Sequence, residues 1–455
     1  MKKYYIITIG CQMNKSDSER IAGRLENFGY KRSDNKYQAD LVIVNTCGVR
    51  QTAEDRIYGL IPEIKKQNKK VKIIVTGCLV YRKDVRHRLG KYVDAWLSIN
   101  KIFNFQFSIF NEFSNQNFQT NAKCKNDYLK IKPIYESKFS AFVPIGNGCN
   151  NFCSYCVVPY ARGIEVYRST KDILEEVKNL IKQGYKEIIL IAQNVNSYKS
   201  KSRIKNELKA NKRELDIDFS DLLKMIDNIK GDFWIRFLTS HPKDMSDKLI
   251  KTIASCEKVC HHIHLPAQTG DDGVLKKMNR KYTAANYIKL VEKIRNFLNY
   301  KLQITNYELW KSPVSITTDI IVGFPGETKK QFNNSVKLLR KVKFDMAYIS
   351  CYSPRLGTLA FKLIDNVSQK EKKDRENKLQ NILRKTALAN NKKYIGKIVK
   401  VLAENKGNAE EWFGKTFTGK NVKFLAKDLK FQAGDFVQVK IIKAKNFCLE
   451  GERNI

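Results

Sequence analysis

Short apolar runs alternate with amphipathic stretches over the first hundred residues of the chain. Tyr4–Ile9, Leu41–Val44 and Ile73–Thr76 are β-branched, apolar and of strand length. Between the first two lies Ser16–Phe28, in which apolar residues recur every three to four positions, as on one face of a helix. This alternation predicts βαβ units and therefore a parallel sheet.

The same alternation resumes from Phe142 to about Ile364. The strand candidates are Glu187–Ile191, Phe233–Leu238, His262–Leu265, Thr317–Val322 and Met346–Ser350. Helical patterns lie between them, for example at Asp172–Gln183 and Thr283–Phe297. Strands and helices in strict alternation predict a (β/α) barrel or a partial one.

The pattern changes again near the carboxyl end. Ser368–Tyr394 is a charged helical stretch, and β signals follow Gly396 at Lys397–Ala403, Trp412–Leu425 and Asp435–Ala444. They predict a small β-barrel. Two polar interruptions of the central pattern, Ser200–Glu214 and Asn299–Pro313, are expected to be solvated loops.

The predicted fold class is therefore α/β with three parts. An amino-terminal parallel-sheet domain is expected at 1–110 and a linker at 111–138, where Asn, Gln, Phe and Lys dominate. A central partial (β/α) barrel domain is expected at 139–390 and a small β-barrel at 391–455. The length of 455 residues suits about three domains.

The charge of the chain points to a polyanionic partner. Lys and Arg number 84 against 46 Asp and Glu, giving a formal net charge of +38. Nucleic acid is the first candidate. A membrane surface is the weaker alternative, because no amphipathic basic helix with an anchor is found and no apolar run approaches the ~18 residues that span a bilayer. The start lacks a full signal core, so the 11 cysteines indicate metal or catalytic use in a reducing cytoplasm.

Cys149, Cys153 and Cys156 form a C-x3-C-x2-C run on one short segment. Three nearby thiolates suit zinc or an iron–sulfur cluster. A structural zinc usually takes four ligands as two distant pairs, whereas three cysteines on one loop leave a coordination position open. A disulfide-linked loop and a zinc knuckle are the alternatives.

Three further cysteines each follow a predicted strand. Cys11, Cys47 and Cys78 come directly after the three amino-terminal strands. The carboxyl ends of parallel strands share one edge of a sheet, where such folds bind ligands. A single cysteine there would be read as core packing, but three equivalent ones favour a second metal cluster. Cys256 and Cys260, near three histidines, are expected to be packing residues rather than a zinc site.

Two of these motifs resemble a known family. The run around Cys149 resembles the cluster loop of radical S-adenosylmethionine (SAM) enzymes, which implies a 4Fe-4S cluster whose free iron binds SAM, with Tyr155 beside the adenine. The segments around Cys11, Cys47 and Cys78 resemble those of radical SAM methylthiotransferases, which implies a second 4Fe-4S cluster. The tail resembles the TRAM RNA-binding domain of that family.

The resemblance extends to polar residues that follow the central strands, each of which alone would be read as a satisfied strand-end residue. It implies that they hold SAM and the target base: Gln193, Asn194, Arg236, His264, Gln268 and Asp319. In the tail, four residues are expected to contact RNA: Lys415, Phe417, Lys420 and Lys423. About half of the phenylalanines there would instead fill the small barrel's own core. The segment Arg355-Leu356-Gly357-Thr358 departs from relatives, which commonly have Pro before the Gly.

Within the family, the run Gly10–Asn14 and the run Tyr155–Gly163 most resemble the branch that acts on isopentenylated tRNA. The implied activity is the addition of a methylthio group to carbon 2 of N(6)-isopentenyladenosine next to the anticodon. The implied partners are tRNA and a low-potential electron donor, and the chain is expected to be monomeric and cytoplasmic. Two alternatives stay open: methylthiolation of N(6)-threonylcarbamoyladenosine, and a non-catalytic iron–sulfur protein that binds RNA.

Overall fold

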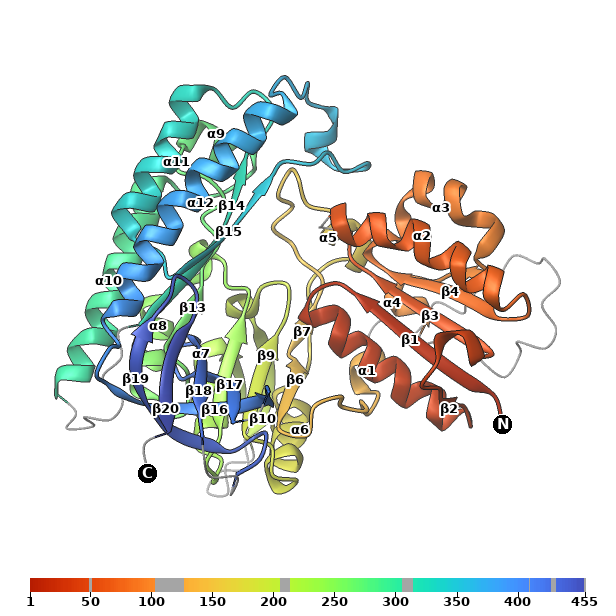
Figure 1. Cartoon of the computed structure of the whole chain (residues 1–455), viewed down its shortest axis with the longest axis horizontal. Coiled ribbons are helices and arrows are strands. Elements are labelled where there is room, and N and C mark those ends of the chain that lie inside the picture. The colour runs from red at the N-terminus through yellow and green to blue at the C-terminus, as the bar shows by residue number, and fades with distance from the viewer. Residues whose placement is uncertain are drawn as a thin grey trace.

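The fold has three bodies that follow one another along the chain. The computed structural model describes residues 1–48, 51–102, 127–204, 213–304, 314–408, 410–426 and 431–453. Figure 1 shows a parallel sheet flanked by helices, a partial barrel in the middle, and a small closed β-barrel at the lower end of the partial barrel. The predicted three-part α/β architecture is confirmed.

The amino-terminal body is a five-stranded parallel sheet in the order β2-β1-β3-β4-β5. Its strands are β1 (Lys3–Ile9), β2 (Lys31–Arg32), β3 (Leu41–Thr46), β4 (Lys72–Gly77) and β5 (Ala95–Trp96). The helices are α1 (Gln12–Asn27), α2 (Gln51–Gln67), α3 (Lys83–Leu89) and α4 (Ile99–Ile102). The sequence pattern thus predicted all three long strands and the first helix.

Helices cover both faces of this sheet, which is why its strands read as continuous apolar runs. On β3, Ile43 belongs to the core that contains Leu25 of α1. Its neighbour Val44 points the other way, into the core that contains Ile57 of α2. Burial on both faces holds the carboxyl edge of the sheet in one place.

The central body consists of two three-stranded parallel sheets, in the orders β12-β9-β6 and β13-β14-β15. Their strands are β6 (Ser140–Pro144), β9 (Glu187–Ile191), β12 (Trp234–Leu238), β13 (His262–His264), β14 (Ser315–Val322) and β15 (Met346–Cys351). The helices around them are α6 (Thr170–Lys182), α7 (Phe219–Asp227), α8 (Asp247–Ser255), α9 (Asp272–Lys277), α10 (Ala284–Ile304), α11 (Lys329–Val342) and α12 (Gln369–Lys392). The two sheets enclose one large apolar core.

The segment Ser200–Glu214, expected to be a loop, belongs in its described part to a hairpin, so that prediction was wrong. Strands β10 (Lys199–Ile204) and β11 (Arg213–Asp218) pair antiparallel. Their register sets Lys199 opposite Asp218 and Lys201 opposite Asp216. Opposite charges across the strands stabilise this pairing, which a polar composition alone does not reveal.

The carboxy-terminal body is a closed barrel in the order β16-β17-β18-β20-β19. Its strands are β16 (Ile398–Lys406), β17 (Glu411–Thr416), β18 (Asn421–Leu425), β19 (Phe436–Ala444) and β20 (Leu449–Arg453). The predicted strand at Trp412–Leu425 is in fact two strands joined by a turn at Gly419, whose φ is +75°. Strand β20 was missed.

The remaining predictions concern the end of one helix, two cysteines, the linker and membrane spans. Helix α10 runs to Ile304, into the segment expected to be a loop. Cys256 and Cys260 are buried packing residues, as expected. Cys124 and most of the predicted linker lie outside the described residues. In the described part of the chain, no helix combines the length and the apolar character needed to cross a membrane.

Candidate functional site

The three amino-terminal cysteines lie side by side at the carboxyl edge of the first sheet. Strand β1 pairs with β3 at Ile9 and Thr46, and β3 pairs with β4 at Thr46 and Gly77, so the three strands end level with one another. Cys11, Cys47 and Cys78 each follow one of these strands. Cys47 and Cys78 are buried and Cys11 is exposed. The predicted proximity of these residues in the fold is therefore present.

Asn14 holds the first of these cysteines in place. Its Oδ1 accepts hydrogen bonds from the Cys11 backbone N–H at 3.2 Å and from the Cys11 Sγ at 3.3 Å. Its Nδ2 donates to Asn45 Oδ1 at 2.8 Å, and Asn45 Nδ2 donates back to the Asn14 carbonyl at 2.8 Å. Sequence analysis assigned no role to this buried pair, although Asn14 stands in the motif that carried the resemblance.

Gly77 is required just before the third cysteine. Its φ is +89°, and a Cβ at this position would lie 2.2 Å from the Thr46 carbonyl oxygen. A residue with a side chain would therefore be strained and would also push β3 and β4 apart. The edge of the sheet can form in this shape only with glycine at 77.

The second cysteine set lies on the loop that follows β7 (Gly146–Asn147). This loop runs past Cys149, Cys153 and Cys156 into the short helix α5 (Val158–Arg162). Gly148, with φ +85°, passes so close to Ile164 that a Cβ would lie 2.1 Å from its carbonyl oxygen. On the other side, Asn279 Nδ2 donates to the Phe152 carbonyl at 2.9 Å and Ser154 N–H donates to Met278 at 3.1 Å. The loop is thus clamped from two sides.

A buried arginine lies beside each cysteine set. Arg280 Nη1 donates to Cys153 Sγ at 3.4 Å, and its Nη2 donates to the Pro266 carbonyl at 2.9 Å. Arg162 lies next to Cys78 and partly offsets the rise in the Cys78 pKa that burial causes. Sequence analysis missed both arginines. Arg162 stands in the run Tyr155–Gly163, whereas nothing in the sequence singles out Arg280.

The donor set fits iron–sulfur clusters. Burial, together with the nearby Cys153, Cys149 and Cys78, raises the pKa of Cys156 to about 12. Because the thiolate form of cysteine ligates metals, these thiols must lose their protons, and the positive charge of bound iron favours that loss. Among the residues the structure describes, no three His, Cys, Asp or Glu side chains converge on a point that would suit a single metal ion. In a 4Fe-4S cluster each cysteine binds a different iron, so the three sulfur atoms do not have to converge on a single metal position.

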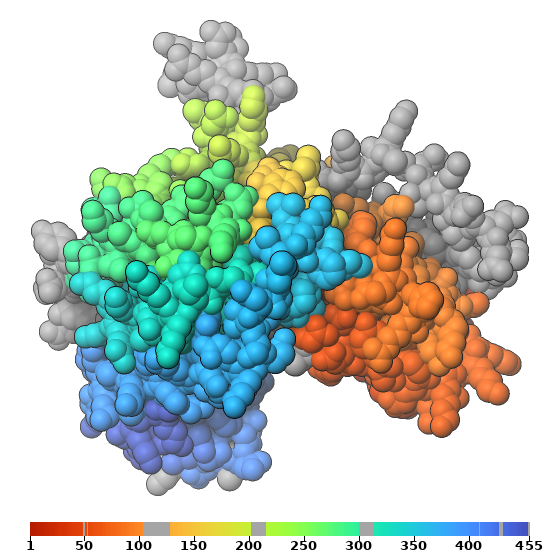
Figure 2. All heavy atoms as spheres, turned by 90° about the horizontal axis from the view of Figure 1, so that it is seen from above, coloured from red at the N-terminus to blue at the C-terminus, as the bar shows by residue number. Residues whose placement is uncertain are grey.

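The two cysteine sets face each other across the interface between the first two bodies. A Cβ on Gly48 would lie 3.2 Å from the Cβ of Cys78 and 3.3 Å from a methyl group of Val157, the residue after Cys156. The loop of one set therefore touches the sheet edge of the other. Figure 2 shows the amino-terminal body, in orange, meeting the central body along this side.

Buried ion pairs fix this interface. Arg162 Nη2 lies 2.6 Å from Asp17 Oδ2, with side chains only 3% and 1% exposed. Arg355 Nη1 lies 3.1 Å from Glu54 Oε2. The same oxygen also accepts a hydrogen bond from Arg82, which belongs to the amino-terminal body like Glu54. Burying such charges is costly unless they are paired, so these contacts specify one arrangement of the two bodies. The unusual segment after β15 thus reaches α2 through Arg355.

Several predicted ligand residues gather at the carboxyl ends of the central strands. His264 Nε2 lies 3.2 Å from Asp319 Oδ2, and the Gln268 backbone N–H donates to the Asp319 carbonyl at 2.8 Å. Among the described residues, three buried oxygens near these strand ends have no hydrogen-bond partner: Gln193 Oε1, Asn194 Oδ1 and Ser240 Oγ. Buried polar atoms normally have partners, so these oxygens fit a ligand that donates hydrogen bonds.

Tyr155 lies in a small apolar cluster at the same end. It packs against buried Val274, Met278, Phe324 and Tyr352, beside Ile321 of β14. This places an aromatic side chain between the cysteine loop and β14, and its contact with an adenine stays a prediction.

Arg236 does not join this group, which corrects its predicted role. Its Nε donates to Glu187 Oε1 at 2.5 Å, and its Nη2 donates to the Thr416 carbonyl at 2.7 Å. Arg236 therefore points toward the closed barrel, and its donors are used there rather than on a cofactor.

Two of the four predicted RNA contacts also need correction. Phe417 packs edge-on against Trp234 at 5.6 Å between ring centroids. Lys420 Nζ lies 2.6 Å from Asp345 Oδ1, and both side chains are 9% exposed. These two residues face the central body. Lys415 and Lys423 remain on the surface, where they form ion pairs with Glu404 and Glu411.

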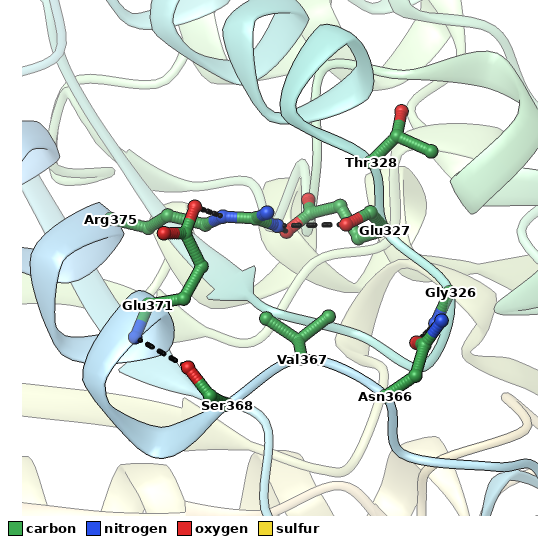
Figure 3. Close-up of a pocket in the computed structure, with 8 residues that line it drawn as sticks. All are labelled: Gly326, Glu327, Thr328, Asn366, Val367, Ser368, Glu371 and Arg375. Carbon is green, nitrogen blue, oxygen red and sulfur yellow. Dashed lines mark hydrogen bonds and ion pairs between the residues drawn. The ribbon is translucent and has the colours of Figure 1, made fainter.

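A pocket of about 310 Å³ lies between the start of α11 and the start of α12 (Figure 3). It is lined in part by Glu327 and Arg375, which form an ion pair at 2.7 Å. Glu327 also accepts a hydrogen bond from the Gly323 backbone N–H at 2.7 Å. The segment from Gly323 to Thr328 is thus fastened to α12 through Glu327.

Comparison with known proteins gives matches over all three bodies. Residues 3–98 match the uncharacterized protein family UPF0004, residues 143–339 the radical SAM superfamily, and residues 392–453 the TRAM domain. The chain is 40% identical to a tRNA-2-methylthio-N(6)-dimethylallyladenosine synthase of Clostridium tetani, covering 99% of this chain and 96% of that protein. A synthase of the same name from Thermoanaerobacter pseudethanolicus is 39% identical, with 99% and 92% covered.

Solved structures share the fold at low sequence identity. The radical SAM methyltransferase TsrM from Kitasatospora setae, with tryptophan and a SAM analogue bound, has a TM-score of 0.50 at 12% identity over 79% of this chain and 75% of that one. The cobalamin-dependent SAM radical enzyme OxsB has a TM-score of 0.51 at 9% identity, over 74% and 52%.

Proposed function

Because the chain belongs to the methylthiotransferase family of radical SAM enzymes, we propose that it adds a methylthio group to carbon 2 of N(6)-isopentenyladenosine next to the anticodon in tRNA. The observation that carries the proposal is that Gly48, the residue after Cys47, packs against both Cys78 and Val157, the residue after Cys156, so the segments that bear the two cysteine sets meet across one interface. A single radical site would need only one such set. Two sets that face each other suit a reaction in which one supplies a radical and the other supplies sulfur to the same carbon.

The cofactors follow from this arrangement. A radical SAM protein uses a 4Fe-4S cluster and SAM, and Cys149, Cys153 and Cys156 are the residues that would hold this cluster. Cys11, Cys47 and Cys78 would hold a second one. When bound, these groups would supply a 5′-deoxyadenosyl radical and a methylated sulfur, chemistry that side-chain acids and bases cannot provide at an aromatic C–H bond.

The protein's own contribution is to position the two cysteine sets and the bound SAM or base. The ion pairs of Arg162 with Asp17 and of Arg355 with Glu54 fix the distance between the two cysteine sets. The unpartnered oxygens of Gln193, Asn194 and Ser240 would accept hydrogen bonds from SAM or from the base. Holding both reacting groups on one carbon replaces a bimolecular encounter by a fixed geometry.

The partners are tRNA and a low-potential electron donor, in keeping with the formal net charge of +38. Lys415 and Lys423 are the tail residues that we retain as RNA contacts. The monomeric state, the cytoplasmic location and the domain boundaries at 110, 138 and 390 stay predictions.

Iron counting after anaerobic reconstitution tests the two-cluster assignment. We expect ~8 irons per chain, since each 4Fe-4S cluster holds four. Four or fewer would contradict the assignment. A Cys149→Ala variant should lose the modified nucleoside while still binding isopentenylated tRNA. If that variant kept the product, the enzymatic role of the loop would be wrong; if the wild-type protein bound tRNA but gave no product, a non-catalytic RNA-binding role would replace the proposal.

A further inference from the structure

The turn between β17 and β18, Thr416–Lys420, closes the amino end of the central barrel. Gly419 lies against His262 of β13, since a Cβ on Gly419 would be 2.8 Å from His262 Nδ1. Phe417 packs against Trp234 of β12 and His261, with ring centroids 5.6 and 5.3 Å away. The turn is therefore inserted between strands of both three-stranded sheets.

Two charged contacts fasten this turn, one to each sheet. Arg236 of β12 donates from Nη2 to the Thr416 carbonyl at 2.7 Å while its Nε binds Glu187 of β9. On the other side, Lys420 pairs with Asp345. Asp345 also accepts the Ile316 backbone N–H at 2.9 Å and so holds the start of β14. The turn thus fixes the two sheets relative to each other.

A chain of hydrogen bonds runs from the Thr416–Lys420 turn toward the carboxyl end of the central barrel. Thr317 Oγ1 lies 3.3 Å from His262 Nε2 and 3.0 Å from His264 Nδ1. His264 Nε2 in turn lies 3.2 Å from Asp319 Oδ2. Thr317 and Asp319 lie two positions apart on β14 and so point to the same face of the strand. The next residue on that face is Ile321, which packs in the cluster that contains Tyr155.

The anion at the end of the chain sets its direction. Asp319 as a carboxylate only accepts, so His264 donates to it from Nε2, and in the neutral imidazole Nδ1 is then the acceptor. Nδ1 then accepts from the Thr317 hydroxyl, whose oxygen accepts from His262 Nε2–H. Burial, together with the nearby Arg236, His264, Lys420 and Lys415, lowers the pKa of His262 to about 3, so His262 is neutral, and with its proton on Nε2 its Nδ1 is bare. That bare nitrogen faces Gly419, where a larger residue would collide with it.

We propose that the Thr416–Lys420 turn is the floor of the radical SAM barrel and that it positions Asp319 for SAM through His262, Thr317 and His264. The proposal rests on the function proposed above. It gives the carboxy-terminal barrel a task in cofactor binding that does not depend on tRNA. Gly419, His262 and Thr317 are positioning residues, because they act on Asp319 through their neighbours.

Two substitutions break the chain at different points, and each has a matched control. Thr317→Val removes the hydroxyl with little change of shape, whereas Thr317→Ser keeps it. Gly419→Ala places a methyl group against His262 at a φ of +75°. Gly396→Ala imposes the same backbone strain at a φ of +82°, but no atom lies within 4 Å of its new methyl group.

SAM affinity of the reconstituted full-length protein, measured without tRNA, is the first readout. We expect Thr317→Val and Gly419→Ala to bind SAM about tenfold more weakly, because each disturbs one link of the hydrogen-bond chain to Asp319 and the loss of one buried hydrogen bond typically changes an equilibrium about tenfold. Thr317→Ser and Gly396→Ala should match the wild type, and all four variants should bind tRNA normally. Equal SAM affinity in Thr317→Val and the wild type would overturn the proposal.

Nitrogen NMR of the histidines is the second readout, and it is independent of activity. The chain has only 5 histidines, so selective ¹⁵N labelling of the cluster-free full chain gives few signals to assign. We expect both His262 and His264 to be protonated at Nε2, and Thr317→Val to shift both while Thr317→Ser shifts neither. A His264 protonated at Nδ1 would contradict the chain. If Gly419→Ala unfolds the small barrel, the threonine pair decides alone; if the wild type binds no SAM, the proposed function fails before any variant is compared.

Discussion

The two cysteine sets are built in opposite ways. Cys11, Cys47 and Cys78 come from three strand ends spread over the amino-terminal body and meet only because β1, β3 and β4 end level. Cys149, Cys153 and Cys156 come from one loop and meet because Gly148 and Asn279 clamp it. The first set depends on the integrity of a whole sheet, whereas the second depends on a few local contacts. Damage to one set should therefore leave the other intact.

Cysteine substitutions should give the largest effect and separate the two roles. Cys149→Ala should abolish SAM cleavage and the modified nucleoside together, because the radical has no source. Cys78→Ala should abolish the modified nucleoside while SAM cleavage to 5′-deoxyadenosine continues. Chromatography of both products from one reaction measures this, and each variant should retain ~4 irons. Loss of SAM cleavage in Cys78→Ala would show that the sets are not independent.

The buried pair Arg162–Asp17 joins the two sets, and breaking it should affect stability most. Arg162→Met leaves the Asp17 carboxylate buried without its partner, which costs about 3–5 kcal/mol of unfolding free energy. Denaturant unfolding followed by circular dichroism measures the change. The double variant Arg162→Met with Asp17→Leu should recover most of the loss, since an apolar pair can replace a buried ion pair.

A surface pair serves as the control for that experiment. Lys293 and Asp247 also form an ion pair, but their side chains are 40% and 63% exposed. Lys293→Met should cost less than about 1 kcal/mol. If Arg162→Met cost no more than this control, the Arg162 pair would not fix the interface.

Two glycines offer a matched test of the difference between sheet and loop. Gly77→Ala and Gly148→Ala each add a methyl group at positive φ, 2.2 and 2.1 Å from a carbonyl oxygen. Such strain costs about 1–3 kcal/mol before the collision is counted. Iron analysis should show that each variant loses part of its iron from its own set only. We expect Gly77→Ala to lower the melting temperature as well, because its collision lies between two central strands.

Substitution of Arg280 should give the smallest effect, a change in reduction potential. Arg280 donates to Cys153, and a positive charge beside a cluster favours its reduced, more negative state. Arg280→Gln should therefore lower the potential of the loop cluster by tens of millivolts, where about 59 mV corresponds to a tenfold change for one electron. Redox titration followed by electron paramagnetic resonance measures it. The potential of the other cluster should not move, and an equal shift in both would argue against a local effect.

Sequence patterns predicted the parts of this molecule that depend on periodicity and spacing. Apolar runs located the strands, and the position of Cys11, Cys47 and Cys78 after those runs predicted that they would meet. Burial on both faces makes such strands easy to recognise. The interface residues were harder, because an arginine such as Arg162 looks the same in a sequence whether it pairs with Asp17 or lies in solvent.

The predictions for Arg236, Phe417 and Lys420 were wrong for the same reason. Arg236 lies in a central strand and Lys420 in a basic tail, so each was assigned to the nearest expected ligand. Which way a side chain points depends on how the closed barrel packs against the central one, and no local pattern encodes that packing. Phe417, Lys420 and Arg236 are all used in that contact.

The central claim is that the two cysteine sets act together on one carbon of an isopentenylated adenosine. Mass spectrometry of the nucleosides tests it most directly, after tRNA bearing isopentenyladenosine is incubated anaerobically with reconstituted protein, SAM and a reductant. The account predicts that isopentenyladenosine gains one methylthio group at carbon 2 and that threonylcarbamoyladenosine in a parallel tRNA is unchanged. Unmodified isopentenyladenosine in a reaction that still forms 5′-deoxyadenosine would contradict it.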